Sequence, residues 1–365
     1  MRGLSWRNFD FLLFGAVVLA SAFGAMMIRS AIAGNEDLVG YDTRQAYFAA
    51  SGALVIVLLA SIDYRYWLST HWPIYIVMML FLMSLSGLGQ AAFGAQRWFQ
   101  VGVLFIQPTE FAKIVVILAL SRFFDRSKHD ARDLKWLLKS LAWVWGLVIW
   151  ILLQPNLSNV IVMMFIWASM VWMNRVPMRQ IGWMALAGIA IAVLAFPVLE
   201  PYQQARVINF ALPDPEARTG ATYNVLQALI AIGSGGLFGK GYGHGTQTQL
   251  RFMKVRHTDF VFSVTAEEFG MIGAVLIVVI EAFVIYRCLR AAQKARDLAG
   301  AMIAYGVAML IFFQSATNIA VNLRLIPVSG LPLPFVSYGG SSLMALMIGI
   351  GMVESVVMRH KELEF

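Results

Sequence analysis

The sequence contains few charged residues. Only 13% of its 365 residues are charged, whereas 59% are hydrophobic and the mean hydropathy is +0.71. Soluble globular domains carry about 25% charged residues, so this composition excludes an ordinary water-soluble domain. A bilayer core about 30 Å thick needs roughly 20 apolar residues per helical span. We therefore predict an all-α polytopic membrane protein that forms a single domain over residues 1–365.

Cysteine is nearly absent, because Cys288 is the only one. A single cysteine excludes an intrachain disulfide, and a packing role is its simplest interpretation. Acidic residues are outnumbered by basic ones, which gives a net charge of +8. The cations are scattered among apolar segments and form no single soluble face. We therefore expect no nucleic-acid partner, and anionic lipid is the expected partner of these cations.

Ten apolar runs predict about ten transmembrane helices. The first run follows a short basic segment, but it is longer than the roughly 7–15 apolar residues of a signal peptide and is expected to remain as a span. The runs are Phe9–Ile28, Ala46–Ile62, Pro73–Leu88, Thr109–Phe124, Leu137–Leu153, Leu157–Met173, Ile181–Leu199, Phe260–Arg287, Ala301–Val321 and Leu333–Met358.

The distribution of Lys and Arg predicts the orientation. An even number of spans puts both termini on one side of the membrane. If that side is the cytoplasm, the inner segments hold 17 Lys and Arg and the short outer segments hold 4. Short cytoplasmic segments carry the excess of these residues, so both termini are predicted to be cytoplasmic.

One long outer segment, residues 200–258, departs from this trend with six cations. Long loops cross the membrane largely regardless of charge, so a tolerated basic loop is one interpretation and an outward-facing anion site is the other. Within it, Tyr223–Ile232 has the pattern of a short helix against the membrane. We predict a long, partly helical extracellular loop.

A glycine-rich stretch in this loop, residues 233–245, contains seven glycines and Lys240. Such a backbone can turn its N–H groups towards an anion, and a phosphate would suit it. It is no P-loop, because Gly241 follows the lysine where Ser or Thr is needed. A flexible or tightly turning loop is the alternative.

Polar residues continue from this loop into the next span. Asp259, Ser263 and Glu267 recur every four residues, directly after His257. Ionisable groups at membrane depth cost several kcal/mol unless they face a cavity or a partner. A carboxylate at this boundary is a candidate general base. The alternative is that Asp259 caps the helix N-terminus.

A second polar group opens the fourth span, where Glu110 and Lys113 lie three residues apart. They are spaced to neutralise each other, so a buried ion pair is one interpretation. Together with Arg97, just ahead of them, they are also candidates for binding a diphosphate.

Prolines and glycines interrupt the apolar pattern between Asn318 and Ser342. Irregular backbone at membrane depth is tolerated where it lines protein or a cavity, which predicts a re-entrant or kinked segment. Ser337 and Ser341 are its candidate substrate-binding residues. Close helix packing through small residues is the alternative for Gly339 to Ser342.

In this order, the motifs resemble those of the SEDS family of bacterial cell-wall proteins (shape, elongation, division and sporulation), and the similarity covers nearly the whole chain. The strongest match runs from Asn318 through Arg324 and Pro327 to Ser342. Further matches are Gln107 to Glu110 with Lys113, His257 to Phe260 and Glu267 to Gly270.

The resemblance implies an inverting glycosyltransferase that polymerises lipid II at the outer face of the bacterial cytoplasmic membrane. Gly94 to Trp98 and Ile62 to Arg65 look more like the elongation member of the family than the division member. Where the family usually has an aspartate this chain has Asn156, which cannot act as a base. The implied partners are lipid II with its growing glycan, a class B penicillin-binding protein, and other membrane proteins of the elongation complex.

These observations assign roles to the polar residues. Asp259 is the predicted catalytic base and a possible ligand of a divalent cation, Mg²⁺ or Mn²⁺, and no organic cofactor is expected. A lipid II flippase or transporter and a noncatalytic scaffold of the cell-wall synthesis complex are the alternative functions. The predicted substrate-binding residues are Arg97, Glu110, Lys113, Arg206, Lys240, His257, Ser263, Glu267, Ser337 and Ser341.

Overall fold

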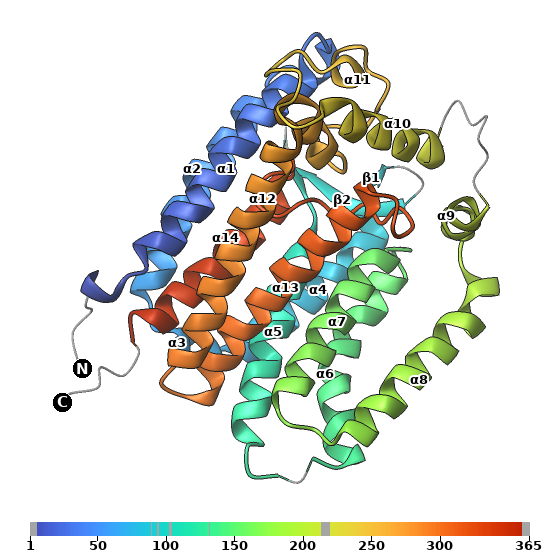
Figure 1. The fold of residues 1–365 in the computed structure, drawn as a ribbon. Helices are drawn as coiled ribbons and strands as arrows, with labels where there is room; N and C mark the ends of the chain where they lie inside the picture. Colours follow the sequence, from blue (N-terminus) through green and yellow to red (C-terminus); the bar gives the residue numbers. More distant parts are fainter. Residues whose placement is uncertain are drawn as a thin grey trace.

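The computed structural model is a bundle of long helices (Figure 1). It describes residues 6–88, 90–92, 95–101, 104–130, 132–212 and 220–359. Within these ranges, one helix forms at each of the ten predicted runs, which confirms the all-α polytopic architecture. These helices are α1 (Phe11–Ile32), α2 (Tyr41–Ser61), α4 (His71–Leu88), α5 (Pro108–Arg126), α6 (Leu134–Leu152), α7 (Leu157–Met173), α8 (Met178–Ala195), α12 (Val261–Lys294), α13 (Leu298–Asn322) and α14 (Gly340–Val357).

By length and composition, seven helices of the described part can cross a membrane: α1, α2, α6, α8, α12, α13 and α14. Both α4 and α7 contain shorter apolar stretches. Local sequence fixes several helix starts. Side chains of Asp10, Asp133 and Asp297 accept hydrogen bonds from the first turns of α1, α6 and α13, as N-cap residues do.

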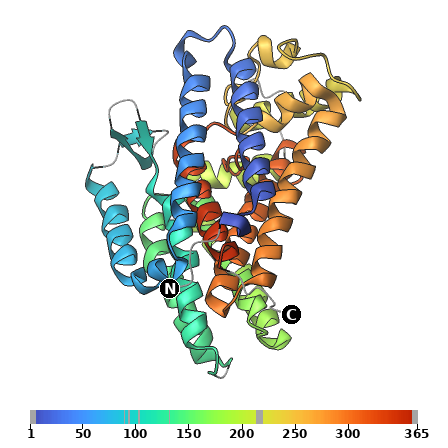
Figure 2. The same cartoon turned by 90° about the vertical axis from the view of Figure 1, so that its left-hand side faces the viewer.

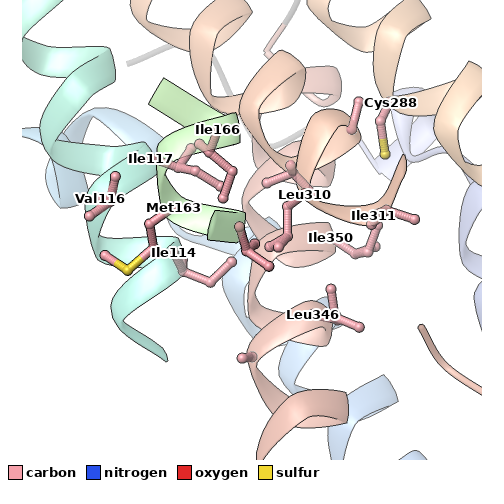
Figure 3. Packing of buried hydrophobic residues seen from close by; sticks show 14 of the residues in the cluster. Ile114, Val116, Ile117, Met163, Ile166, Cys288, Leu310, Ile311, Leu346 and Ile350 are labelled. Carbon is pink, nitrogen blue, oxygen red and sulfur yellow. The ribbon is translucent and has the colours of Figure 1, made fainter. Parts of the chain in front are cut away.

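The core lies where α5, α7, α13 and α14 meet. Figure 3 shows Ile114 and Ile117 of α5 facing Met163 of α7 and Leu310 of α13, and all four are buried. Cys288 is also buried, in agreement with a packing role. In contrast, α8 buries none of its apolar window and lies at one side of the bundle (Figure 1).

The connections contain structure that the apolar pattern missed. Residues between α4 and α5 form an antiparallel meander of β1 (Gln90–Ala92), β2 (Ala95–Val101) and β3 (Leu104–Ile106), in that order. The short helical elements elsewhere are η1 (Trp6–Asn8), η2 (Glu36–Leu38), α3 (Tyr64–Ser69) and η3 (Phe196–Val198).

The long loop is partly helical, as predicted. The helix predicted over Tyr223–Ile232 is confirmed as α10 (Gly220–Gly235), between α9 (Pro201–Ala211) and α11 (Thr246–Gln249). At the other end of the chain, the predicted span Leu333–Met358 is wrong at its start. Helix α14 begins at Gly340, and residues 323–339 are irregular, which agrees with the prediction of a broken segment.

The glycine-rich stretch packs into a break in α12. At this break, Gly270 has φ of +67° and ψ of −162°. The N–H groups of Lys240 and Gly241 donate to the carbonyls of Glu267 and Glu268 at 3.0 and 2.9 Å. A carbonyl freed by a helix break must find a donor inside a membrane protein, and this loop supplies it. These two N–H groups are therefore not available to a phosphate.

Candidate functional site

Asp259 lies in the turn that leads into α12, with its side chain half-buried. The N-cap position of α12 is Phe260, and no side chain forms a capping hydrogen bond there. The interpretation of Asp259 as a helix cap is therefore wrong. The loop before it and α10 form the end of the bundle that is uppermost in Figure 1.

Two asparagines of α13 hold the backbone of Asp259. The Nδ2 groups of Asn318 and Asn322 donate to the Asp259 carbonyl at 3.0 and 2.9 Å. Both asparagines are buried, where an unpaired polar group costs about 1–3 kcal/mol. Asn322 is not among the predicted site residues, although a second amide four residues after Asn318 in an apolar helix is a usable sequence signal.

The irregular segment 323–339 closes over the same turn. The Oγ of Ser337 donates to the Thr258 carbonyl at 2.5 Å, and the N–H of Tyr338 donates to the His257 carbonyl at 3.0 Å. Ser337 therefore stabilises the backbone of the turn that precedes Asp259.

The backbone of this segment is unusual next to the Asp259 carboxylate. Gly330 has φ of +71°, and a Cβ at this position would lie 3.9 Å from Oδ2 of Asp259. Arg324 and Phe335 also have positive φ, at +55° and +58°. At a non-glycine residue, backbone of this kind costs of the order of 1–3 kcal/mol and clusters at functional sites.

Arg206 brings positive charge to the same place. It extends from α9 and donates to the carbonyls of Val328 and Ser329 at 3.3 and 3.4 Å. Its charge acts on Asp259. The fold thus brings the predicted base, Asp259, close to a predicted cation, Arg206, although the two residues lie more than fifty positions apart in the sequence.

The surroundings of Asp259 change its acidity. Burial of the carboxyl raises its pKa to about 6, while the Arg206 guanidinium and a hydrogen bond from Thr258 act in the opposite direction. A carboxylate with this pKa is ionised at neutral pH and is a stronger base than an exposed aspartate.

His257 lies beside this turn among aromatic rings. Its ring centroid is 5.8 Å from that of Tyr41 and 5.9 Å from that of Tyr338. Burial, together with the neighbouring Arg256 guanidinium, lowers the pKa of His257 to about 4. The imidazole is therefore neutral at physiological pH.

Glu110 and Lys113 form the predicted buried pair. The Nζ of Lys113 lies 2.7 Å from Oε2 of Glu110 and donates to Oδ1 of Asn159 at 3.3 Å. Nδ2 of Asn159 in turn donates to Thr109 at 3.2 Å. Asn159 is a further polar residue that the sequence analysis did not select.

This pair borders the irregular segment that contacts Asp259. The Oγ of Ser158, next to Asn159, donates to the Ser329 carbonyl at 2.5 Å. At the start of α14, Oγ of Ser341 accepts from the N–H of Gln107 at 3.0 Å. The start of α7 thus contacts this segment, and the start of α5 contacts the helix that follows it.

Lys240 and Glu267 lie in a separate cluster. Nζ of Lys240 is 2.9 Å from Oε1 of Glu267, whose carboxylate also accepts from Gln247 N–H and from Oγ1 of Thr248, each at 2.9 Å. Because Glu267 is fully buried, this cluster ties the loop to α12. Substrate-binding roles for these two residues stay predictions.

Three sequence predictions concern other positions. Ser263 is buried and its Oγ donates to Asn322 at 2.5 Å, so it supports the asparagine pair. Arg97 belongs to β2, and its side chain lies outside the described residues. Asn156 is buried at the N-cap of α7 without a side-chain capping bond.

The side chains near Asp259 determine whether the chain could hold a metal ion there. Among the described residues, no group of three or more His, Cys, Asp or Glu side chains is placed to hold an ion. Mg²⁺, however, often uses one or two carboxylates and completes its shell with substrate phosphates and water. Asp259 would supply one such carboxylate, which fits this kind of site.

Comparisons with known proteins agree with the fold and the motifs. The model of the family of FtsW, RodA and SpoVE, described as cell cycle protein, matches residues 8–362. The peptidoglycan glycosyltransferase MrdB of Escherichia coli (strain K12) is 35% identical over 345 residues, which cover 93% of this chain and 92% of that protein. Stage V sporulation protein E of Bacillus subtilis (strain 168) is 30% identical over 357 residues, which cover 95% of this chain and 96% of that protein.

Solved structures of similar proteins extend the comparison. One, from work on the structural coordination of polymerization and crosslinking by a peptidoglycan synthase complex, has a TM-score of 0.80 at 30% identity and covers 96% of this chain and 98% of its own. The crystal structure of the rod shape determining protein RodA of Thermus thermophilus has a TM-score of 0.72 at 30% identity, with coverage of 98% and 99%.

Proposed function

The chain belongs to the SEDS family of FtsW, RodA and SpoVE, and we propose that it is a peptidoglycan glycosyltransferase that polymerises lipid II into glycan strands during cell elongation. The observation that carries this proposal is the Asp259 carboxylate, held by its backbone, raised in pKa to about 6 and placed near Arg206. A multi-pass location in the bacterial inner membrane follows from the helices and from the relatives.

Asp259 acts as the general base in this mechanism. The carboxylate takes the proton of the acceptor sugar 4-hydroxyl as that oxygen attacks the anomeric carbon of the donor. A carbon–oxygen bond forms on one face while the bond to the diphosphate breaks on the other, which inverts the anomeric carbon. General bases contribute about 10²–10⁴-fold to such a rate.

Cations receive the departing diphosphate. Arg206 lines one recess together with Arg324, Pro327 and Val328 of the irregular segment that packs on the turn before Asp259. Prepositioned positive charge stabilises the negative charge that gathers on the leaving group in the transition state. Lys113 and Arg97 are proposed to extend this positive region, and His257 and Ser337 to shape the sugar site.

Asp259 is the residue that would hold a divalent cation, Mg²⁺ or Mn²⁺, in the substrate complex. Such an ion would add positive charge at the leaving group. The chain's own contribution is then to orient the Asp259 carboxylate through Asn318 and Asn322.

The orientation and the partner are also proposals. The excess of Lys and Arg on the side of the termini supports cytoplasmic termini, with Asp259 at the outer face. One similar structure comes from a synthase complex that couples polymerisation to crosslinking. This supports a class B penicillin-binding protein as the partner of this chain.

Replacement of Asp259 by Asn tests the proposed function. Purified Asp259→Asn protein is expected to polymerise lipid II at least about 10²-fold more slowly than the unmodified chain, because the base is lost. Asp37→Asn, which changes an exposed carboxylate, is the matched control and is expected to remain active. Equal activity of the two variants would remove Asp259 from the mechanism.

A vesicle assay separates the proposal from its rivals. Protein reconstituted with lipid II on one side of the membrane is scored separately for translocation and for polymer. Translocation without polymer would support a transporter, and neither activity in the presence of a functional partner enzyme would support a scaffold.

A further inference from the structure

A second pocket lies at the opposite end of the bundle from Asp259. It has a volume of about 530 Å³ and is lined by α5, α6 and the start of α4. Along α5, the distance from Pro108, near the Asp259 site, to Arg126 at this pocket is about 27 Å. In Figure 1 the turn between α5 and α6 is at the bottom, whereas α10 and α11 are at the top.

Two pairs of cations from neighbouring helices line this pocket. Arg122 and Arg126 are one turn apart on α5, and Lys135 and Lys139 are one turn apart on α6. Residues at this spacing lie on the same helix face, so two positive rows border one space.

The nearby carboxylates neutralise these rows only in part. Asp125 lies 3.5 Å from one nitrogen of Arg122. Within the described ranges, no ion pair forms at Arg126, Lys135 or Lys139. Of the two aspartates that line the pocket, Asp133 accepts a hydrogen bond from the first turn of α6. Positive charge remains in excess around the pocket.

Arg122 also has an unused donor. Its Nε is buried and has no hydrogen-bond partner in the part of the chain that the structure describes. Buried donors in proteins are nearly always paired. A ligand that supplies a hydrogen-bond acceptor would pair with this Nε of Arg122.

Tryptophan side chains line the pocket, and their positions are held by ring contacts and a hydrogen bond. The ring of Trp143 lies 4.8 Å from that of Trp72, and Nε1 of Trp136 donates to Ser127 at 2.9 Å. Arg132 stacks on Trp136 with its Cζ 4.6 Å from the ring centroid. Tryptophans with flanking cations are typical of the interface between the bilayer and water.

We propose that this pocket binds the phosphate-bearing headgroup of an anionic phospholipid, through Arg122, Arg126, Lys135 and Lys139. The proposed orientation makes this a lipid of the cytoplasmic leaflet. The excess of positive charge on that side explains the number of cations, but their convergence on one aromatic pocket fits a specific headgroup. The inference is independent of the glycosyltransferase activity.

Native mass spectrometry of the delipidated full chain tests the site. The probes are phosphatidylglycerol and phosphatidylcholine with identical acyl chains, and the competitors are millimolar inorganic phosphate and a polyprenyl diphosphate. The test variant is Lys135→Gln with Lys139→Gln, two exposed residues. The matched control, Lys128→Gln with Arg179→Gln, removes the same charge from exposed positions outside the pocket.

The expected result is preferential binding of phosphatidylglycerol that falls about thirtyfold in the test variant and stays unchanged in the control. Equal losses in both variants would reduce the effect to general surface charge and overturn the proposal. Binding of phosphatidylcholine with the same affinity, complete displacement by millimolar inorganic phosphate, or a preference for a polyprenyl diphosphate would also overturn it.

Discussion

At the scale of single residues, the backbone and the carboxyl group of Asp259 are controlled by different groups. Asn318 and Asn322 bind its carbonyl, and Ser337 binds the carbonyl before it. Burial raises the pKa of its side chain and Arg206 lowers it. Position and acidity of Asp259 are thus controlled separately, and each can be perturbed alone.

Arg206→Gln is predicted to move the acid limb of the pH–rate profile. The base must be ionised, so kcat/KM is expected to fall below about pH 6, the pKa of Asp259. Because the Arg206 charge lowers this pKa, its removal raises the pKa and shifts the limb to higher pH. The profile of lipid II polymerisation between about pH 5 and 8 measures the shift.

The control for Arg206 is Lys254→Gln, which removes an exposed cation of the same loop that does not act on Asp259. Its acid limb is expected to coincide with that of the unmodified protein. If the acid limb of the pH–rate profile of Arg206→Gln does not shift, Arg206 does not influence the pKa of Asp259.

Asn318→Leu is predicted to reduce polymerisation about 10–100-fold in protein that still folds. The substitution removes donors to the carbonyls of Asp259 and Leu331, and a small displacement of a catalytic group has effects of this size. Gln314→Met on the same helix is the control, since Gln314 is buried with no hydrogen-bond partner in the described residues. Similar activity losses in both would indicate a general packing effect.

Removal of divalent ions is predicted to lower polymerisation and leave the fold intact. The physical reason is that Asp259 would supply one carboxylate and the substrate its phosphates, so an ion would bind firmly only in the complex. Activity after chelation and after return of Mg²⁺ or Mn²⁺ is the measurement. Full activity in the chelator would show that the cationic side chains suffice.

At the scale of elements, the break in α12 explains the glycine-rich loop. The loop inserts where Gly270 leaves helical geometry, and Lys240 and Gly241 donate to freed carbonyls. The ion pair of Lys240 with Glu267 fastens the same junction. The glycine-rich composition, which is also typical of anion-binding loops, therefore serves here to supply hydrogen bonds to the carbonyls that the helix break leaves unpaired.

Gly270→Ala is predicted to lower the melting temperature of the detergent-solubilised protein. A Cβ at residue 270 would lie 2.4 Å from the Gly239 nitrogen, and the backbone has φ of +67°. Strain at such a position costs about 1–3 kcal/mol before the clash is included. Gly15→Ala, where no atom lies within 4 Å of the added Cβ, is the control and is expected to melt at or above the original temperature.

At the scale of the whole molecule, the two ends of the bundle differ in chemistry. One end holds Asp259 beneath the helical loop, and the other holds the basic pocket between α5 and α6. Figure 2 shows that the start of α1 and the end of α14 lie away from the loop at the top of the bundle, and the N–H of Asp10 donates to Glu354 there. The proposed orientation therefore places synthesis outside and the pocket and termini inside.

Thiol labelling of intact cells tests this orientation. In a background with Cys288→Ala, a membrane-impermeant reagent is expected to label Phe238→Cys, in the exposed glycine-rich loop, but not Lys128→Cys in the α5–α6 turn. After lysis both are expected to react. The reverse pattern would place Asp259 in the cytoplasm and exclude synthesis at the outer face.

The sequence alone determined the class of fold and the identity of the polar residues. Runs of apolar residues specify helices because the bilayer leaves backbone groups no other partner, so all ten runs form helices. Asp259 and the Glu110–Lys113 pair were visible as charges that the membrane would otherwise exclude, and Arg206 was visible as one of six cations in the long outer loop. The β-meander and the start of α14 were missed, since short strands and broken helices have no strong periodicity.

Only the tertiary structure decided which of these residues share a site. The segment 323–339 contacts the turn before Asp259, Arg206 and Ser158 at once, while Lys240 pairs with Glu267 at the helix break. Such contacts depend on how distant helices pack, and packing geometry is not encoded in local spacing. The roles of Asn322 and Asn159 likewise appear only when two helices are brought together.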